Sequence, residues 1–462
     1  MSGASSHPRR FHQARGGGWH PRDPAVVAGW IGWLRQEAAV RNLAEVPPIT
    51  ALRGLVQTTP SLLSLANSMF AEALARAPTT PLGQPSVVDF DEFLLLLNVI
   101  MQTAPEAFQN YNTNPPPEFE PAGLIGFPIN ALLNWPMATA AGYDFFSNML
   151  VNSSFHAVLV YWSQFLVSAA STYVLTEAPR PISPTTVALP WLGPDAQAEM
   201  VSVAQGALGD GPNPTPPTFS DIFNCDPSLP SYGFQSWDGF FTRTFKTGVR
   251  PVSGPGDDSI IVNACESAPL QVVSNVAATD QFWLKGQPYS LTDMMANDPL
   301  AAQFAGGTVY QAFLSALSYH RWHSPVSGTV VSAFVVPGSY YLENYYQGYA
   351  GSNPDSSAPN QSQPFLSSVA TRAVMFLQSD NPKIGLMCVV AIGMAEVSSC
   401  EITVVAGQRV KKGDQIGMFH FGGSTHCLVF RPGVNLSFDF YGQTPNLDAT
   451  NMRVNTRLAT VS

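Results

Sequence analysis

A change in the pattern of apolar residues near residue 219 constrains the fold more than any other feature of the sequence. Beyond it, short runs rich in β-branched residues alternate with glycine: GTVVSAFVVPG, IGLMCVVAIG, EITVV and QIGMFHF. Such runs are typical of β-strands. Before it, from about Asp23 to Thr176, apolar residues recur every three or four positions, which is typical of amphipathic helices. The sequence therefore predicts an α+β protein in which an all-helical domain precedes a β-rich one.

Proline-rich stretches divide the chain further. NTNPPPEFEP interrupts the helical half, and a longer stretch follows it between residues 178 and 221. Such stretches mark loops and linkers. We expect four parts: a disordered tail (1–22), a helical accessory domain (23–180), a proline-rich linker (181–218) and a β-rich domain (219–462), with a helix near 291–304.

The composition excludes several classes of function. Only 12% of the 462 residues are charged and the net charge is −10, so no basic field attracts nucleic acid or an anionic membrane. The basic residues of the tail are not followed by an apolar segment, so we expect no signal peptide. Five scattered cysteines form no CxxC pair, which favours a reducing compartment over a disulfide framework. We therefore expect a cytoplasmic protein.

One uncharged run, Phe145 to Thr176, is long enough to span a bilayer. It contains several polar residues, among them Asn148, Asn152 and His156, and no Lys or Arg flanks it closely. A buried helix of a globular domain is the favoured interpretation, and we expect no stable membrane insertion.

The first candidate for chemistry is SYHRWHSPVSGTV. His320 and His323 stand three residues apart before a turn into a strand, and histidine is the side chain best suited to move protons near neutral pH. Packed or surface histidines explain this spacing equally well. No third ligand stands at a recognisable spacing, so no metal site is expected.

The second candidate is FHFGGSTHCLVF, where Ser424 follows two glycines. A GxSxG nucleophile elbow requires glycine at the position of His426, and a hydrolase of that class places an acid and then a histidine after the serine. A turn explains the glycines, but so does an attack by Ser424 on its own backbone. Gly423 has no Cβ to hinder its carbonyl, and it tolerates a strained turn.

Such an attack would exchange the Gly423–Ser424 peptide bond for an ester, once a general base takes the Oγ proton. Elimination and hydrolysis would then leave a pyruvoyl group at residue 424. Its ketone can form a Schiff base with an amine and accept electrons as a carboxylate leaves, the role that pyridoxal plays elsewhere.

Four ordered motifs now identify a family. Over about residues 234–430 the chain resembles the phosphatidylserine decarboxylase family of pyruvoyl-dependent enzymes. The matching segments are WDGFFTRTFKTGVRPV, FWLKGQPYSLTDMM, YHRWHSPVSG and FHFGGSTHCLVF.

The resemblance implies roles for single residues. Ser424 would become the pyruvoyl cofactor after cleavage from Gly423, without pyridoxal phosphate, giving chains 1–423 and 424–462. His323 would be the base for self-cleavage, and His320 would serve the substrate site and proton transfer. The family's aspartate is replaced in NACES by Glu266, which would orient His323 or be a solvated loop acid.

Other departures concern the substrate. Ser318 replaces the family's usual aspartate, and an extra helical domain precedes the β-rich half. This layout is similar to that of the fungal pyruvoyl-type aromatic amino acid decarboxylases. Tyr319, Trp322 and His426 are the candidates for contact with the substrate.

We therefore expect decarboxylation of an aromatic L-amino acid, L-tryptophan to tryptamine, through a Schiff base. Phosphatidylserine decarboxylation is the alternative, and an inactive relative that serves as a binding module is the second. A small amino acid is the expected partner, in a monomer or homodimer.

Overall fold

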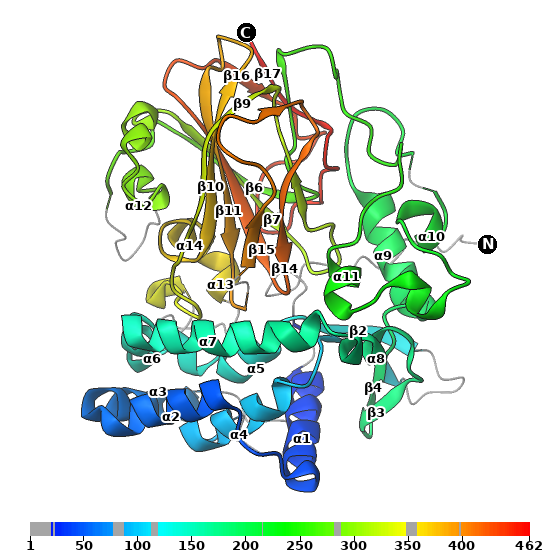
Figure 1. Cartoon of the computed structure of the whole chain (residues 1–462), viewed down its shortest axis with the longest axis vertical. Coiled ribbons are helices and arrows are strands. Elements are labelled where there is room, and N and C mark those ends of the chain that lie inside the picture. The colour runs from blue at the N-terminus through cyan, green and yellow to red at the C-terminus, as the bar shows by residue number, and fades with distance from the viewer. Residues whose placement is uncertain are drawn as a thin grey trace, which may run out of the picture.

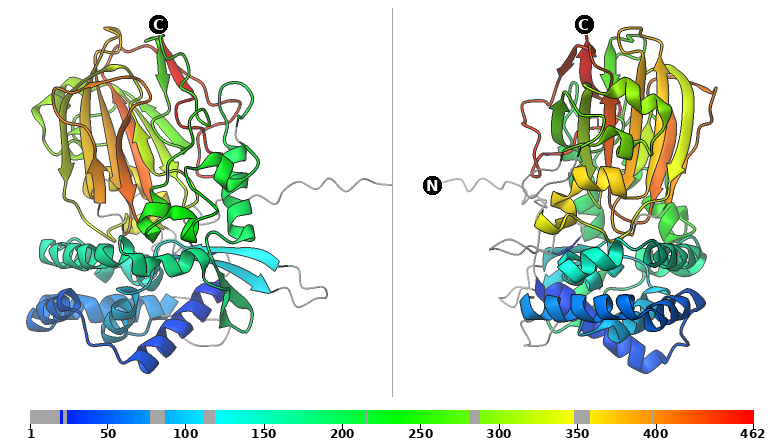
Figure 2. Two further views of the ribbon diagram at one scale, coloured as in Figure 1. Left: turned by 45° about the vertical axis from the view of Figure 1, so that its right-hand side comes forward. Right: turned by 90° about the vertical axis from the view of Figure 1, so that its left-hand side faces the viewer.

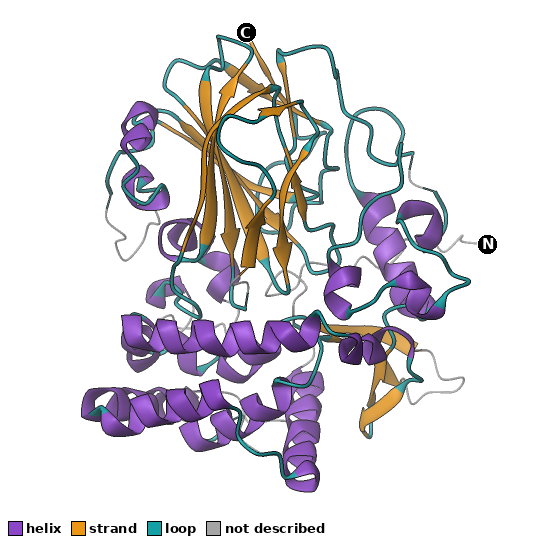
Figure 3. Ribbon diagram, viewed as in Figure 1, coloured by secondary structure: helices purple, strands orange, loops and turns teal. Residues whose placement is uncertain are grey.

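A computed structural model describes residues 20–21, 24–76, 87–111, 119–214, 216–280, 288–347, 358–396 and 399–462. A β-sandwich forms the upper part of the molecule in Figure 1, and layers of helices lie across its lower end. Figure 3 shows that the large sheet lies in the upper part and most of the long helices in the lower part, where a small sheet lies beside them. The predicted fold class, α+β with helices before a β-rich half, is confirmed.

The sandwich is built around a seven-stranded sheet in which every strand pair is antiparallel. In spatial order its strands are β13 (Arg409–Val410), β9 (Gly328–Val336), β10 (Arg372–Ser379), β11 (Leu386–Gly393), β15 (Ser424–Phe430), β7 (Thr308–Leu314) and β6 (Ala268–Ser274). Two three-stranded sheets complete the β-rich half. The first consists of β12 (Ser399–Ile402), β14 (Gln415–His420) and β8 (Arg321–His323). The second consists of β16 (Leu436–Phe438), β17 (Arg457–Val461) and β5 (Ile260–Val262).

Strand β15 is buried along its whole length. Successive side chains of a strand point to opposite faces of its sheet. Leu428 and Phe430 accordingly belong to the core within the sandwich, whereas Cys427 and Val429 belong to the core that continues into the helices. Burial on both faces explains why this segment is almost continuously apolar.

The helical layer consists of α1 (Pro24–Arg41), α2 (Pro47–Thr58), α3 (Pro60–Arg76), α4 (Phe90–Ile100), α5 (Pro128–Leu133), α6 (Ala140–Phe146), α7 (Met149–Leu166) and α8 (Tyr173–Thr176). Helix α7 lies closest to the ends of the sandwich strands, as Figures 1 and 2 show. The Asn148 side chain caps its first turn, and Phe155 and Trp162 lie on its buried face. The Trp162 indole N–H donates to the Thr103 carbonyl at 2.9 Å.

The run from Phe145 to Thr176 is thus α7 with its neighbours. No single helix in the described parts of the chain is long and apolar enough to cross a membrane. The pair Met149–Leu166 and Ala169–Thr176, bent by 71°, passes that test by length and composition.

The accessory domain also contains a small sheet that was not predicted. Its strands, in spatial order, are β2 (Phe119–Ile125), β1 (Glu106–Tyr111), β4 (Thr186–Leu189) and β3 (Arg180–Ser183). The expected linker 181–218 holds β4 and the helix α9 (Pro194–Gly206) instead of extended chain throughout. Within the expected tail, the described His20 contacts Asn130 and Phe127, and residues 1–19 and 22 lie outside the described residues.

Short helices fill the remaining connections. They are α10 (Phe219–Ile222), α11 (Trp237–Phe241), α12 (Leu291–Met294), α13 (Ala358–Gln361) and α14 (Gln363–Val369). The predicted helix near 291–304 is α12 followed by a 3₁₀ segment at Pro299–Phe304.

A substitution of Phe155 can measure how much the packing between the helical layer and the β-rich half contributes to stability. Its ring packs on Phe93 and Phe146 of the helical layer and on Tyr341 of the β-rich half, with centroids 6.3, 5.5 and 5.2 Å away. Phe155→Ala should lower the free energy of unfolding by about 3–5 kcal/mol, because it leaves a cavity in this junction. Chemical denaturation of the uncut Ser424→Ala chain, followed by tryptophan fluorescence, measures the loss.

The matched control is Met149→Ala on the same helix, where the side chain is 83% exposed. This change should stay within about 0.5 kcal/mol. Equal losses for the two variants would show that Phe155 does not join the halves.

Candidate active site

Ser424 is the first residue of β15. Its register partners are Gly393 on β11 and Leu314 on β7, so the serine enters the middle of the large sheet directly. The side chain is fully buried, and Ser424 Oγ has no hydrogen-bond partner among the described residues. A buried hydroxyl without a partner is costly, so this position stores free energy that a reaction of the hydroxyl can release.

The loop before Ser424 has an unusual backbone. Phe421 has a φ of 37° and Gly422 a φ of 128°. A bulky side chain in the left-handed region costs on the order of 1–3 kcal/mol, and such residues concentrate at functional sites. The turn that the two glycines predicted is therefore present, and it is strained.

The Gly423 carbonyl is the group that Ser424 would attack. Its oxygen accepts the Met394 backbone N–H at 3.0 Å. A donor in this position polarises the carbonyl and stabilises negative charge that develops on its oxygen. On the other side, a Cβ added to Gly423 would overlap the ring of Phe127 at the start of α5. Only glycine fits between Phe127 and the sheet.

The first motif histidine, His320, is fully buried, and its ring stacks on that of Phe241 with centroids 4.0 Å apart. Burial lowers the pKa of His320 well below its usual value, and the Arg243 charge lowers it further. His320 is therefore neutral at pH 7 and can accept a proton.

His323 is partly buried and held by other groups. Its Nδ1 lies 2.7 Å from the Gly413 carbonyl and its Nε2 lies 3.0 Å from the Tyr319 hydroxyl, so Nδ1–H donates and Nε2 accepts. Its register partner is Gln415, at the opposite end of β14 from His420 and the cleavage loop. Burial lowers the pKa of His323 as well. No contact with Ser424 is observed, and its role as the base stays a prediction.

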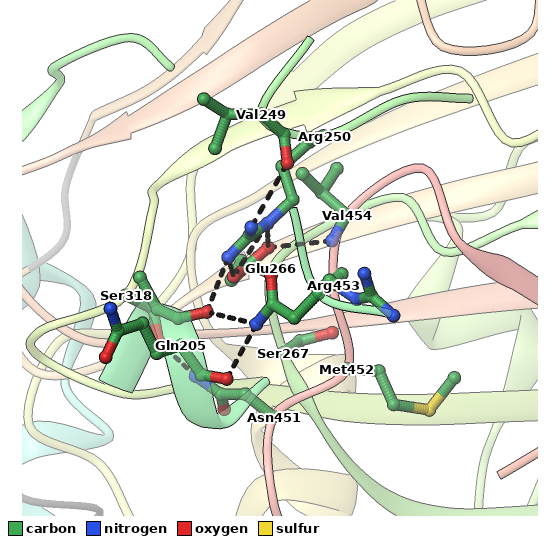
Figure 4. A network of polar contacts seen from close by, with 12 residues as sticks. Gln205, Val249, Arg250, Glu266, Ser267, Ser318, Asn451, Met452, Arg453 and Val454 are labelled. Atoms are coloured by element: carbon green, nitrogen blue, oxygen red, sulfur yellow. Dashed lines mark hydrogen bonds and ion pairs between the residues drawn. The ribbon is translucent and has the colours of Figure 1, made fainter. Parts of the chain in front are cut away.

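Glu266 is buried and pairs with Arg250, as Figure 4 shows. Arg250 Nη2 lies 2.5 Å from Oε1 and Nε lies 3.0 Å from Oε2, while the Val454 N–H donates to Oε2 at 2.8 Å. Glu266 is thus not a solvated loop acid. These hydrogen bonds do not join it to His323, so its orienting role has no contact to support it and stays a prediction.

The three candidates for substrate contact lie apart. Tyr319 stacks on Phe245 at 4.4 Å besides meeting His323, and Trp322 packs edge-on against Phe419 inside the sandwich at 4.7 Å. His426 follows Ser424 by two residues and therefore shares its face of β15. Burial lowers its pKa to about 3.

Two titratable residues beside the cleavage loop were missed by sequence reasoning. His420 ends β14, with Nδ1 3.0 Å from the Asp238 carboxylate and Nε2 2.8 Å from Glu401 Oε2. Burial alone would lower the pKa of His420, but the two carboxylates outweigh it and raise the pKa. The carboxylates of Asp238 and Glu401 therefore favour the protonated form of His420 and hold the start of the loop. Its position four residues before Ser424 was the available signal.

The second missed residue is Glu396, which follows Met394 by two positions. It is fully buried, and its Oε1 accepts the Asn130 N–H at 2.7 Å. Nothing in the local sequence marks it, because its partner lies 266 residues away.

Cleavage before Ser424 would leave the small chain embedded in the large one. Strand β15 pairs with β11 and β7 on its two sides, and β17 pairs with β5. The Glu266–Val454 hydrogen bond adds a buried link between the two products.

The strained Gly-Gly loop before Ser424 and the N–H bound to the Gly423 carbonyl suit a pyruvoyl-type decarboxylase, the class that the comparisons with known proteins support. Two family models, both described as phosphatidylserine decarboxylase, match residues 237–446 and 46–200. The chain belongs to the phosphatidylserine decarboxylase family, as its four motifs predicted.

Individual relatives extend this finding. Decarboxylase iboD of Amanita muscaria is 40% identical over 68% of this chain and 86% of its own length. An L-tryptophan decarboxylase of Psilocybe cubensis is 32% identical over 90% of this chain and 88% of its own. Phosphatidylserine decarboxylase proenzyme 3 of Schizosaccharomyces pombe is 29% identical over 48% of this chain and 21% of its own.

The contact between Gly423 and Phe127 predicts a rescue. Gly423→Ala should slow self-cleavage at least about tenfold, because the added methyl displaces the carbonyl from its position. Adding Phe127→Ala removes the opposing ring and should restore part of the rate. The fraction of cut chain over time, by intact mass after synthesis, measures both.

Phe127→Ala alone serves as the control and should still be cut. If the double variant is cut no faster than Gly423→Ala, the ring is not what excludes a side chain at position 423.

The Glu266 ion pair predicts a stability loss. Glu266→Ala leaves Arg250 charged and buried without its carboxylate, which should cost about 3–5 kcal/mol in the Ser424→Ala background. Replacing both residues by Met removes both charges and should cost less. Denaturant unfolding measures the two losses, and a double variant as unstable as Glu266→Ala would contradict this account.

Proposed function

We propose that this chain is a self-processing pyruvoyl-dependent decarboxylase of an aromatic L-amino acid, with L-tryptophan as the expected substrate. The main support for an aromatic amino acid as substrate is how much of this chain each relative matches. The L-tryptophan decarboxylase of Psilocybe cubensis matches 90% of this chain, a share that includes most of the helical domain. The phosphatidylserine decarboxylase proenzymes compared with it match 46–52%.

Self-cleavage follows from the geometry around Ser424. A neutral histidine takes the Oγ proton, and Oγ attacks the Gly423 carbonyl carbon as the Met394 N–H binds the developing oxyanion. The peptide C–N bond then breaks, and Gly423 is joined to Ser424 by an ester. Loss of the Cα proton expels the Gly423 carboxylate and leaves dehydroalanine at residue 424. This enamine becomes an imine, and hydrolysis of the imine releases ammonia and leaves the ketone at residue 424.

The residues around Ser424 fit such a group. The Oγ that would be lost makes no hydrogen bond among the described residues, so its removal breaks none. The pyruvoyl ketone supplies an electron acceptor for the pair left behind when the carboxylate departs as CO₂. Burial at the end of the sheet excludes water from this step.

Aromatic side chains support an aromatic substrate. Phe127 touches Gly423, Phe421 lies in the cleavage loop, and Trp162 packs on Phe421 with centroids 6.3 Å apart. Phe127 and Trp162 belong to the helical half, whereas Phe421 belongs to the β-rich half. They offer faces on which a planar ring can pack once the cut ends separate.

A substrate panel tests the proposal. Purified protein is incubated with L-tryptophan, L-phenylalanine, L-tyrosine and, separately, phosphatidylserine vesicles, and CO₂ release is followed. We expect release from an aromatic amino acid, fastest with L-tryptophan. Release from the vesicles alone would overturn the substrate class and favour the alternative activity.

Ser424→Ala is the matched control. It should stay uncut by intact mass and release no CO₂ from any substrate, because it cannot form the ketone. An uncut wild-type chain that still decarboxylates would refute the pyruvoyl mechanism.

A further inference from the structure

Glu396 lies where the helical layer meets the cleavage site. Met394, two residues before it, binds the Gly423 carbonyl, and Asn130, which binds Glu396, is three residues after Phe127, which touches Gly423. The same short segment of the helical layer therefore contacts both the scissile glycine and this carboxyl group. Glu396 is thus linked to the Gly423–Ser424 bond on two sides, through Met394 in its own segment and through Asn130 and Phe127 in the helical layer.

The Glu396 carboxyl group has one engaged oxygen and one unused oxygen. Oε1 accepts the Asn130 N–H, whereas the buried Oε2 has no hydrogen-bond partner in the described parts of the chain. Burial raises the pKa of Glu396 to about 8, although the backbone N–H groups of Asn130, Glu396 and Ile129 act to lower it. At pH 7 the group therefore holds a proton.

The titratable groups around Glu396 leave that proton in place. Tyr341 is one neighbour, since a charge on Glu396 would act on it. Burial raises the pKa of Tyr341 well above its usual value. His20 binds the Asn130 side chain at 2.7 Å, and burial lowers the pKa of His20 to about 4. Both neighbours are neutral at pH 7, so neither stabilises a Glu396 carboxylate.

Decarboxylation needs such a proton. When the bond between the α-carbon and the carboxylate breaks, the electron pair stays with the substrate, and a proton must reach the α-carbon to complete the amine. Burial lowers the pKa values of His320, His323 and His426, so their neutral imidazoles are suited to accept the Ser424 proton. A protonated carboxyl group such as that of Glu396 is suited to supply one.

We propose that Glu396 is the general acid of the reaction and that its unpartnered Oε2 delivers a proton to the substrate α-carbon as CO₂ leaves. A new C–H bond forms, and Glu396 becomes a carboxylate that regains its proton from solvent. The inference rests on the proposed decarboxylation but not on which amino acid is the substrate.

The first test needs no turnover. In the uncut Ser424→Ala chain, infrared difference spectroscopy should show a protonated carboxyl band at pH 7 that disappears as the pH rises through about 8. The band should be absent from Ser424→Ala/Glu396→Gln. If the two spectra are identical at pH 7, Glu396 is ionised and the proposal is overturned.

The second test follows turnover. Glu396→Gln keeps an oxygen for the Asn130 N–H but has no acidic proton. It should be cut as wild type is, and kcat should fall about 10²–10⁴-fold, the usual contribution of a general acid. Wild-type kcat should decline as the pH rises through about 8, because the protonated fraction falls, and Glu396→Gln should lose this dependence. Glu396→Asp should retain it.

Glu199→Gln is the matched control. Burial also raises the pKa of Glu199, to about 7, and it lies on α9, beside the sandwich in Figure 1. This variant should keep the wild-type rate and pH profile.

The outcomes separate the two proposals. Wild type that decarboxylates only phosphatidylserine overturns the substrate class, and the Glu396 test then uses phosphatidylserine. Glu396→Gln with wild-type kcat and pH profile overturns the acid role alone. A Glu396→Gln chain that stays uncut also overturns it, since Glu396 would then serve cleavage.

Discussion

The structure depends on the position of one peptide bond. The Gly423–Ser424 bond joins a strained loop to β15, a strand that is buried along its whole length and paired on both sides with neighbouring strands. Ser424 is therefore fixed in the sheet, while the backbone just before it is strained. This asymmetry suits a bond that breaks without unfolding the protein, because the strand stays in place when the loop is released.

The helical layer completes this arrangement rather than only covering the sandwich. Phe127 rests on Gly423, the Asn130 N–H binds Glu396, and Trp162 packs on Phe421. All three reach the site from the helical half, which the second phosphatidylserine decarboxylase model matches over residues 46–200. A substrate that binds between the cut ends would meet surfaces from both halves, which links the accessory domain to the choice of substrate.

Two buried carboxyl groups near the site show how environment sets their use. Glu266 meets the Arg250 guanidinium and the Val454 N–H, and the second contact would link the two products of the proposed cleavage. Glu396 accepts the Asn130 N–H, and among the described residues it has no ion pair, so burial favours its protonated form. The first environment stabilises a charged carboxylate and the second a neutral carboxyl group.

The sequence by itself determined the fold class, the order of helical and β-rich halves, and the turn before Ser424. Strand and helix periods are local signals, and the Gly-Gly-Ser-Thr turn carries its own backbone requirement, so neither needs distant partners. The small sheet of β1 to β4 escaped prediction because its strands are short and separated by about 60 residues of other structure.

Only the tertiary structure decided what surrounds the serine. Met394, Phe127, Glu396 and the Asp238–His420–Glu401 cluster reach the site through contacts between segments far apart in the chain, and the pattern of any one segment does not encode them. Such a contact also pairs Glu266 with Arg250, a partner that the sequence pattern did not indicate. Burial, which sets the protonation of His320 and Glu396, exists only once the two halves have packed together.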